Sequence, residues 1–129
     1  MSTSSSFGFL VVDDEKELAN LFEEYIRGIG CDVTSFTNPE YALGHYKQYS
    51  DKYSLILTDL RMPGMSGIEF ANRVRELNST VKIFLITAFD VDAIKDEENY
   101  QKARIDKVLR KPIKLSTLKE VIKQELLFY

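Results

Sequence analysis

The chain has 129 residues, of which 44% are hydrophobic and 29% are charged, as is ordinary for one globular domain with a substantial core. Its net charge of −3 argues against nucleic acid or an anionic membrane as a direct partner, and no apolar run approaches the roughly 20 residues that a membrane span requires. The single cysteine, Cys31, excludes an intrachain disulfide and fits a reducing compartment, so we expect a cytoplasmic protein. The serine-rich residues 1–6 lack the basic and apolar regions of a signal peptide, and we expect a disordered leader followed by one domain over residues 7–129.

Strand-like and helix-like segments alternate from the start of this domain. An apolar run at residues 7–12 stops at two adjacent acids and predicts a strand. Apolar residues at helical spacing predict a helix over 18–29, and a weaker strand follows at 32–36. An asparagine N-cap and a first-turn proline then open a predicted helix at 39–49.

The second half of the chain continues the alternation. Residues 54–58 predict a buried strand that ends in an acid, and a capping box formed by Ser66 and Glu69 predicts the start of a helix. The remaining predicted elements are a strand at 81–86, a highly charged helix at 90–103, a strand at 106–110 and a helix at 115–126.

Five successive strand-then-helix units predict an α/β fold. Right-handed crossovers place the helices on both faces of a parallel sheet. In such a sheet, ligands bind beyond the carboxyl ends of the strands. The residues at these strand ends are polar, namely Asp13, Asp14, Asp59, Thr87 and Lys111. We therefore expect three carboxylates, a hydroxyl and an ammonium to meet at one edge of the sheet.

This set of groups predicts a metal-dependent phosphoryl acceptor. Two carboxylates about 4 Å apart repel by roughly 4 kcal/mol at an effective dielectric near 20, so three of them are costly without a cation. Oxygen ligands without histidine or cysteine select Mg²⁺, with Mn²⁺ as the alternative. A carboxylate can act as the nucleophile toward phosphorus, and Lys111 and Thr87 suit the phosphoryl oxygens that the metal leaves uncovered.

Four motifs resemble those of the response-regulator receiver family of two-component signalling, in the same order and at about the same spacing. They are Val-Val-Asp-Asp at 11–14, Asp-Leu-Arg-Met-Pro-Gly-Met-Ser-Gly at 59–67, Thr-Ala at 87–88 and Lys-Pro at 111–112. The second motif is specific by itself, and the four together are very specific. The resemblance implies the flavodoxin-like doubly wound (βα)5 fold, a three-layer sandwich with a parallel sheet of strand order 2-1-3-4-5.

The same resemblance implies a role for each site residue. Asp59 would be the phosphoacceptor, Lys111 would bind the phosphoryl group through a Lys-Pro peptide that is usually cis, and Thr87 would be the switch hydroxyl. The metal ligands would be Asp59, Asp14, Asp13 (mainly through water) and the backbone carbonyl of Arg61.

The sequence departs from the family pattern just before the lysine. Val108 stands at the switch position where the family usually has Tyr or Phe, so the coupled rotation of an aromatic ring with Thr87 is brought into question. Arg104 and Ile105 replace a common Gly-Ala pair, and the stretch from Thr87 to Lys111 is slightly longer than usual. We expect the phosphoryl chemistry to be that of the family. We expect the output face, formed by the fourth helix, fifth strand and fifth helix, to be unusual.

The expected function is that of a phosphorylation-activated signalling module. A sensor histidine kinase or phosphotransfer protein would supply the phosphoryl group, and the chain would catalyse only its own phosphorylation and dephosphorylation. It would contact a downstream protein through the face just described, as a monomer or as a phosphorylation-dependent homodimer. One alternative is a pseudo-receiver that interacts without phosphorylation, although such proteins typically lose an acid or the lysine. The other is a small Mg²⁺-dependent aspartyl phosphatase. Against it, the haloacid-dehalogenase pattern places the nucleophile and a second acid two residues apart after the first strand, whereas the acids of this chain are adjacent.

Two hypotheses concern the segment after Thr87. The narrow apolar stripe of residues 90–103 predicts a helix of low stability, which would be the mobile element that phosphorylation biases. Phe89 is expected near the entrance of the site, where it would slow the access of water to an acyl phosphate.

Overall fold

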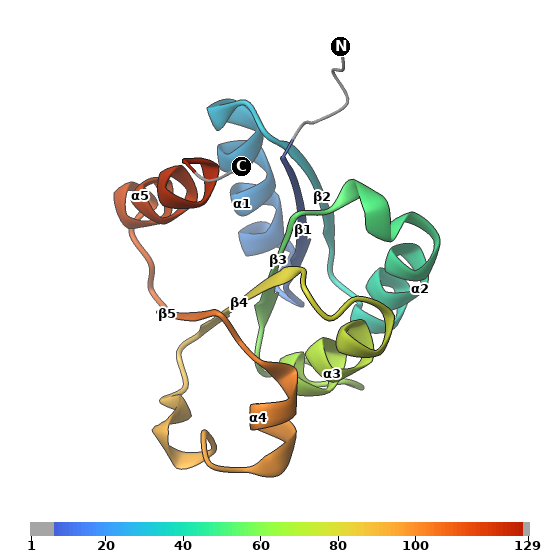
Figure 1. Ribbon diagram of the computed structural model, residues 1–129. Coiled ribbons are helices and arrows are strands. Elements are labelled where there is room, and N and C mark those ends of the chain that lie inside the picture. The colour runs from blue at the N-terminus through green and yellow to red at the C-terminus, as the bar shows by residue number, and fades with distance from the viewer. Residues whose placement is uncertain (1–6, 128–129) are drawn as a thin grey trace.

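The computed structural model describes residues 7–127, and it has an open five-stranded sheet with helices on both faces (Figure 1). The strands are β1 Gly8–Val12, β2 Asp32–Phe36, β3 Leu55–Asp59, β4 Lys82–Thr87 and β5 Lys107–Arg110. The helices are α1 Lys16–Ile29, α2 Pro39–Tyr49, α3 Gly67–Leu77, α4 Glu98–Ala103 and α5 Leu115–Leu126. All neighbouring strands are parallel, in the order β2-β1-β3-β4-β5, which confirms the predicted flavodoxin-like arrangement. The predicted leader at 1–6 and the last two residues of the predicted domain lie outside the described residues.

Two apolar layers hold the helices to the sheet. Helices α1 and α5 cover one face, and α2, α3 and α4 cover the other (Figure 1). Every residue of β1 and β3 is buried, and both strands are apolar up to the polar end of β3, whereas the edge strand β2 is half exposed and less apolar in sequence. No helix among the described residues is both long enough and apolar enough to cross a bilayer.

The ends of the helices follow the predicted signals. Gly30 ends α1 with a left-handed φ of 106°, and its N–H donates to the carbonyl of Arg27 at 3.0 Å. The side chain of Asn38 accepts hydrogen bonds from the first turn of α2. The Ser66 hydroxyl accepts from the N–H of Glu69 at 3.1 Å, as a capping residue does.

The predicted helix over 90–103 is wrong in its first half. The Asp90 side chain accepts from the N–H of Asp92 at 2.9 Å, and a 3₁₀ turn follows at Val91–Ala93. The next backbone bonds join residues three apart, so the chain enters α-helical geometry only at Glu98. The acidic side chain at the start of the segment therefore competed with the helix and displaced its first turns.

Helix α3 begins in direct contact with the end of β3. The N–H of Gly67 donates to the carbonyl of Leu60 at 2.7 Å, and a Cβ atom on Gly67 would fall on the backbone oxygen of Asp59. Only glycine allows this close approach of the two backbones. The first turn of α3 is thus packed against the peptide of the strand-end acid.

Candidate functional site

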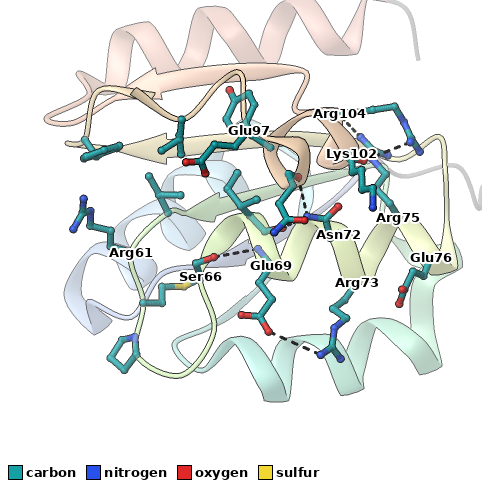
Figure 2. Close-up of a pocket in the computed structure, with 18 residues that line it drawn as sticks. Arg61, Ser66, Glu69, Asn72, Arg73, Arg75, Glu76, Glu97, Lys102 and Arg104 are labelled. Carbon is teal, nitrogen blue, oxygen red and sulfur yellow. Dashed lines mark hydrogen bonds and ion pairs between the residues drawn. The ribbon is translucent and has the colours of Figure 1, made fainter. Parts of the chain in front are cut away.

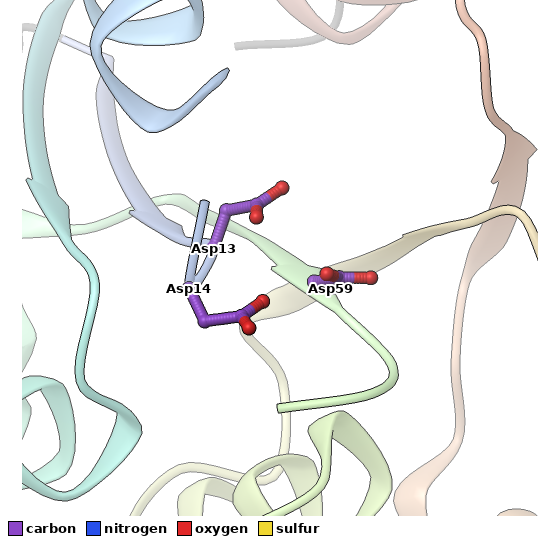
Figure 3. A group of neighbouring side chains, drawn as sticks. All are labelled: Asp13, Asp14 and Asp59. Atoms are coloured by element: carbon purple, nitrogen blue, oxygen red, sulfur yellow. The ribbon is translucent and has the colours of Figure 1, made fainter. Parts of the chain in front are cut away.

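Three carboxylates converge at the carboxyl ends of β1 and β3 (Figure 3). Asp13 and Asp14 follow β1, and Asp59 is the last residue of β3, one strand along in the sheet. Each contributes an oxygen atom, and these three atoms lie within 4.8 Å of one another. Asp13 is completely buried and Asp59 is 6% exposed, whereas Asp14 faces solvent. The sheet therefore brings together the acids that the sequence predicted to meet.

Lys111 brings a positive charge to this cluster from the loop after β5. Its Nζ atom lies 3.2 Å from Asp13 Oδ2 and 3.2 Å from Asp59 Oδ2. The other carboxylate oxygens are held by the backbone, because Asp13 Oδ1 accepts from the N–H of Glu15 and Asp59 Oδ1 from the N–H of Leu60. One oxygen of each buried acid is thus fixed, and the other faces the ammonium. The Lys111–Pro112 peptide bond is cis, as the family resemblance implied.

One ammonium does not balance this much buried negative charge. Burial raises the pKa of Asp13 above its ordinary value, and the nearby charge of Lys111 only partly offsets the rise. Burial and the neighbouring Asp13 carboxylate likewise raise the pKa of Asp59. For Lys111, burial acts to lower the pKa, but the attraction of the two carboxylates outweighs it and the pKa is raised. Two buried carboxylates thus face a single ammonium, and burial disfavours the charged form of both.

The donor set fits a hard divalent cation. All the side-chain ligands are carboxylate oxygens, which Mg²⁺ prefers. Asp13 Oδ2 is buried and, among the described residues, has the Lys111 charge nearby but no hydrogen-bond donor of suitable geometry. Asp14 and Asp59 could share an ion with this oxygen.

Thr87 lies at the end of β4 and is 2% exposed. Its hydroxyl oxygen accepts from the N–H of Phe89 at 2.9 Å, and its carbonyl accepts from the N–H of Lys111 at 2.9 Å. The backbone of Thr87 is therefore joined to that of Lys111 at the ends of adjacent strands.

Arg61 and Val108, which were also predicted as site residues, lie outside the carboxylate cluster. Arg61 lies in the loop after β3, and its exposed guanidinium stacks 4.4 Å from the ring centre of Phe89. Val108 lies in β5 opposite Leu85 of β4, half-buried, and packs against the apolar layer beneath α3 and α4. Its aliphatic side chain therefore packs against the core.

A groove of about 1230 Å³ runs between α3 and the segment that contains α4 (Figure 2). Arg61 and Phe89 line one part of it, but none of the three clustered carboxylates does. Asn72 and Arg75 reach across from α3, where the Asn72 amide donates to the carbonyl of Asn99 at 2.9 Å (Figure 2). The groove is thus a neighbour of the site and not the site itself.

Two charged residues with specific contacts were missed at the sequence level. Glu15 lies 3.4 Å from Lys111 Nζ through its Oε1 atom, and the only signal for it is a third acid after the Asp-Asp pair. Arg75 has a side chain only 7% exposed, and it donates to the carbonyls of Ala103, Val81 and Arg104 at 2.9, 2.6 and 2.9 Å. A lone arginine on a polar helix face gives no sequence signal of such burial.

Comparison with known proteins agrees with this geometry. Residues 9–123 match the family described as response regulator receiver domain. The response regulator receiver protein CpdR of Brucella abortus is 32% identical over 118 residues, which cover 92% of this chain and 95% of CpdR. The chain also matches the hybrid signal transduction histidine kinase L of Dictyostelium discoideum at 30% identity, but it spans only 7% of that much longer protein.

Solved structures show the same fold. The response regulator protein TrrA of Thermotoga maritima, solved in complex with Mg(2+)-BeF, is 31% identical with a TM-score of 0.75, and the match covers 92% of this chain and 97% of TrrA. The chemotaxis protein CheY4 of Vibrio cholerae superposes with a TM-score of 0.83 at 21% identity, covering 93% of this chain and 98% of CheY4. The match to the family over residues 9–123, together with this fold and its cluster of acids, identifies the chain as a member of the response regulator receiver domain family of two-component systems.

Proposed function

We propose that the chain accepts a phosphoryl group on Asp59, with Mg²⁺, from a sensor histidine kinase or a phosphotransfer protein. The observation that carries the proposal is the convergence of three carboxylate oxygens within 4.8 Å and of the Lys111 ammonium 3.2 Å from Asp59 Oδ2. The likeness to TrrA, whose structure contains Mg(2+)-BeF, supports the same chemistry here.

Asp59 is the proposed nucleophile. Its Oδ1 atom is held by the N–H of Leu60 at 2.8 Å, so the carboxylate has a fixed orientation, and Oδ2 faces the ammonium. A bond forms between this carboxylate and phosphorus while the P–N bond of the donor phosphohistidine breaks, and the electron pair of that bond leaves with the imidazole. Lys111 balances charge on the phosphoryl oxygens, and the Thr87 hydroxyl donates to one of them.

The metal site would use Asp13, Asp14, Asp59 and the backbone carbonyl of Arg61. A bound Mg²⁺ ion, with Mn²⁺ as the alternative, would supply positive charge to the phosphoryl oxygens. Asp13 and Asp14 act from the protein side by holding carboxylate oxygens next to Asp59.

The proposed output is a change at the α4–β5–α5 face that a downstream protein recognises. Phosphorylation adds nearly two negative charges and draws Thr87 and Lys111 toward Asp59. It shifts the conformational equilibrium only by its differential stabilisation of the active state. In this proposal the chain is a cytoplasmic signalling module that catalyses only its own phosphorylation and dephosphorylation, as a monomer or a phosphorylation-dependent homodimer.

Intact mass of the purified protein after incubation with acetyl phosphate and Mg²⁺ tests the proposal. We expect the mass of one labile phosphoryl group, which is absent from Asp59→Asn and from metal-free samples. No gain in mass from acetyl phosphate or from cognate phosphodonors, under conditions where Mg²⁺ demonstrably binds, would favour a pseudo-receiver that interacts without phosphorylation.

A further inference from the structure

Lys111 contacts a carboxylate that does not belong to the metal-competent cluster. Its Nζ atom lies 3.2 Å from both Asp13 Oδ2 and Asp59 Oδ2, and 3.4 Å from Oε1 of Glu15. The ammonium donates hydrogen bonds to Glu15 Oε1 and Asp59 Oδ2, and its contact with Asp13 Oδ2 is an ion pair. Asp13 and Asp59 belong to the group of acids that could hold a cation, and Glu15 does not.

The Glu15 side chain makes this contact instead of a helix cap. Glu15 is the N-cap residue of α1, but its side chain accepts no capping hydrogen bond from the first turn. Its backbone N–H donates to Asp13 Oδ1 at 2.9 Å, which fixes the residue at the rim of the site. Its side chain is 66% exposed and reaches a lysine 96 positions away in the sequence.

We propose that Glu15 is a positioning residue that competes with the phosphoryl group for the Lys111 ammonium. The inference rests on the proposed function of Asp59. A cation held by the acids of this cluster would take up much of the charge of Asp13 and Asp59, and Glu15 would then be the carboxylate contact that Lys111 retains. In this proposal the Glu15 carboxylate draws Lys111 away from the phosphoryl oxygens, and its negative charge also repels the incoming dianion. Glu15 therefore weakens the binding of the phosphoryl group and sets how readily Lys111 engages it.

Beryllofluoride, a non-covalent mimic of the phosphoryl group, provides the test at saturating Mg²⁺. Its dissociation constant is measured by NMR titration of backbone amides, so the readout does not depend on turnover. We expect Glu15→Gln to bind beryllofluoride about twofold to fivefold more tightly than wild type, the range that exposed ion pairs produce. The gain should shrink at high salt, because screening weakens an exposed pair.

Two matched variants separate the contact from the general effect of charge. Glu17→Gln removes the same charge from the exposed first turn of α1, and we expect no change in affinity. Glu15→Asp keeps the charge but is one methylene too short for the lysine, so we expect it to resemble Glu15→Gln more than wild type. Equal tightening by Glu17→Gln, or affinity for Glu15→Gln no tighter than wild type, would overturn the role of Glu15. If wild type binds no beryllofluoride and takes no phosphoryl group, the proposed function fails as well, so the two failures are distinguishable.

Discussion

The guanidinium of Arg61 lies over the aromatic ring of Phe89, 4.4 Å from its centre. Arg61 is two residues after Asp59, and Phe89 is two residues after Thr87, so the pair joins the loops that leave two neighbouring strands. The N–H of Phe89 also donates to the Thr87 hydroxyl. A stacked cation and ring therefore lie beside the strand ends that hold the proposed nucleophile and its hydroxyl partner.

Phe89→Ala should shorten the lifetime of the phosphorylated protein. The substitution removes the ring that we expect to slow the access of water to the acyl phosphate. It also removes the stacking with Arg61, which is worth about 0.5–1 kcal/mol at an exposed site. We expect dephosphorylation to be about twofold to fivefold faster, measured as loss of phosphoryl mass with time. Tyr41→Ala, which removes an aromatic side chain 72% exposed on α2, is the control and should leave the rate unchanged. An unchanged rate in Phe89→Ala would exclude the shielding role.

Neutralising Asp59 should stabilise the metal-free protein at neutral pH. Burial and the Asp13 charge raise the folded-state pKa of Asp59 above its ordinary value of 3.8. The contribution of Asp59 to the free energy of unfolding is therefore fully present below pH 3.8, where the carboxyl is protonated, and is lost as the pH rises through the raised folded-state pKa. We expect the free energy of unfolding of Asp59→Asn to exceed that of wild type by an amount that grows above pH 4 and then levels off, measured by urea unfolding with EDTA. Asp51→Asn, at an exposed position, should show no such growth; a constant or falling difference for Asp59→Asn would contradict the prediction.

Arg75→Met should destabilise the junction between α4 and β5. The buried guanidinium donates to three carbonyls and pairs with Asp106 at 3.4 Å, and methionine would leave these acceptors without their donor. We expect a loss of about 3 kcal/mol or more in the free energy of unfolding, measured with denaturant. Arg73→Met changes an arginine 51% exposed on the same helix and should cost less than about 0.5 kcal/mol. Similar losses in the two variants would show that the Arg75 contacts contribute little.

Arg104→Gly should stabilise the fold. Arg104 has a left-handed backbone, with a φ of 48° and a ψ of 58°, and is the only non-glycine residue with a positive φ among those the structure describes. Glycine adopts this conformation without the Cβ strain, while the side-chain bonds that Arg104 would lose are long and exposed, at 3.4 and 3.5 Å. The left-handed strain of a residue with a Cβ costs about 1–2 kcal/mol, and the greater freedom of glycine in the unfolded chain offsets about 0.5–1 kcal/mol of that gain. We therefore expect a net gain of about 0.5–1 kcal/mol in the free energy of unfolding, measured by thermal or chemical denaturation. Arg104→Ala keeps the Cβ and therefore the strain. If Arg104→Gly is no more stable than Arg104→Ala, relief of backbone strain is refuted as the explanation.

The central elements of the fold were predictable because their patterns are local. Apolar runs ending in acid identified β1 and β3, and the same acids were expected to meet because parallel strands end at one edge. The N-caps at Asn38 and Ser66 were equally readable, since a short polar side chain acts within its own turn.

The parts that escaped prediction depend on contacts distant in the chain or on competition within a turn. The contact of Glu15 with Lys111 spans 96 positions. The burial of Arg75 arises only when α4 and β5 lie against α3. At Asp90, the side chain closes its own turn and delays the fourth helix, although the same acid also suits a helix start.

The close approach of Gly67 to the backbone of Asp59 connects the site directly to helix α3. The backbone of Asp59 rests on the first residue of α3 with no side chain between them, and Arg75 stands eight residues later, about 12 Å along the same helix. Arg75 donates hydrogen bonds to the backbone carbonyls of Ala103 and Arg104, at the connection between α4 and β5. Helix α3 therefore contacts the backbone of Asp59 at its first residue and is hydrogen-bonded through Arg75 to the junction of α4 and β5. These contacts connect Asp59 with the α4–β5 junction through α3, in a chain where Val108 replaces the aromatic residue whose ring could rotate together with Thr87.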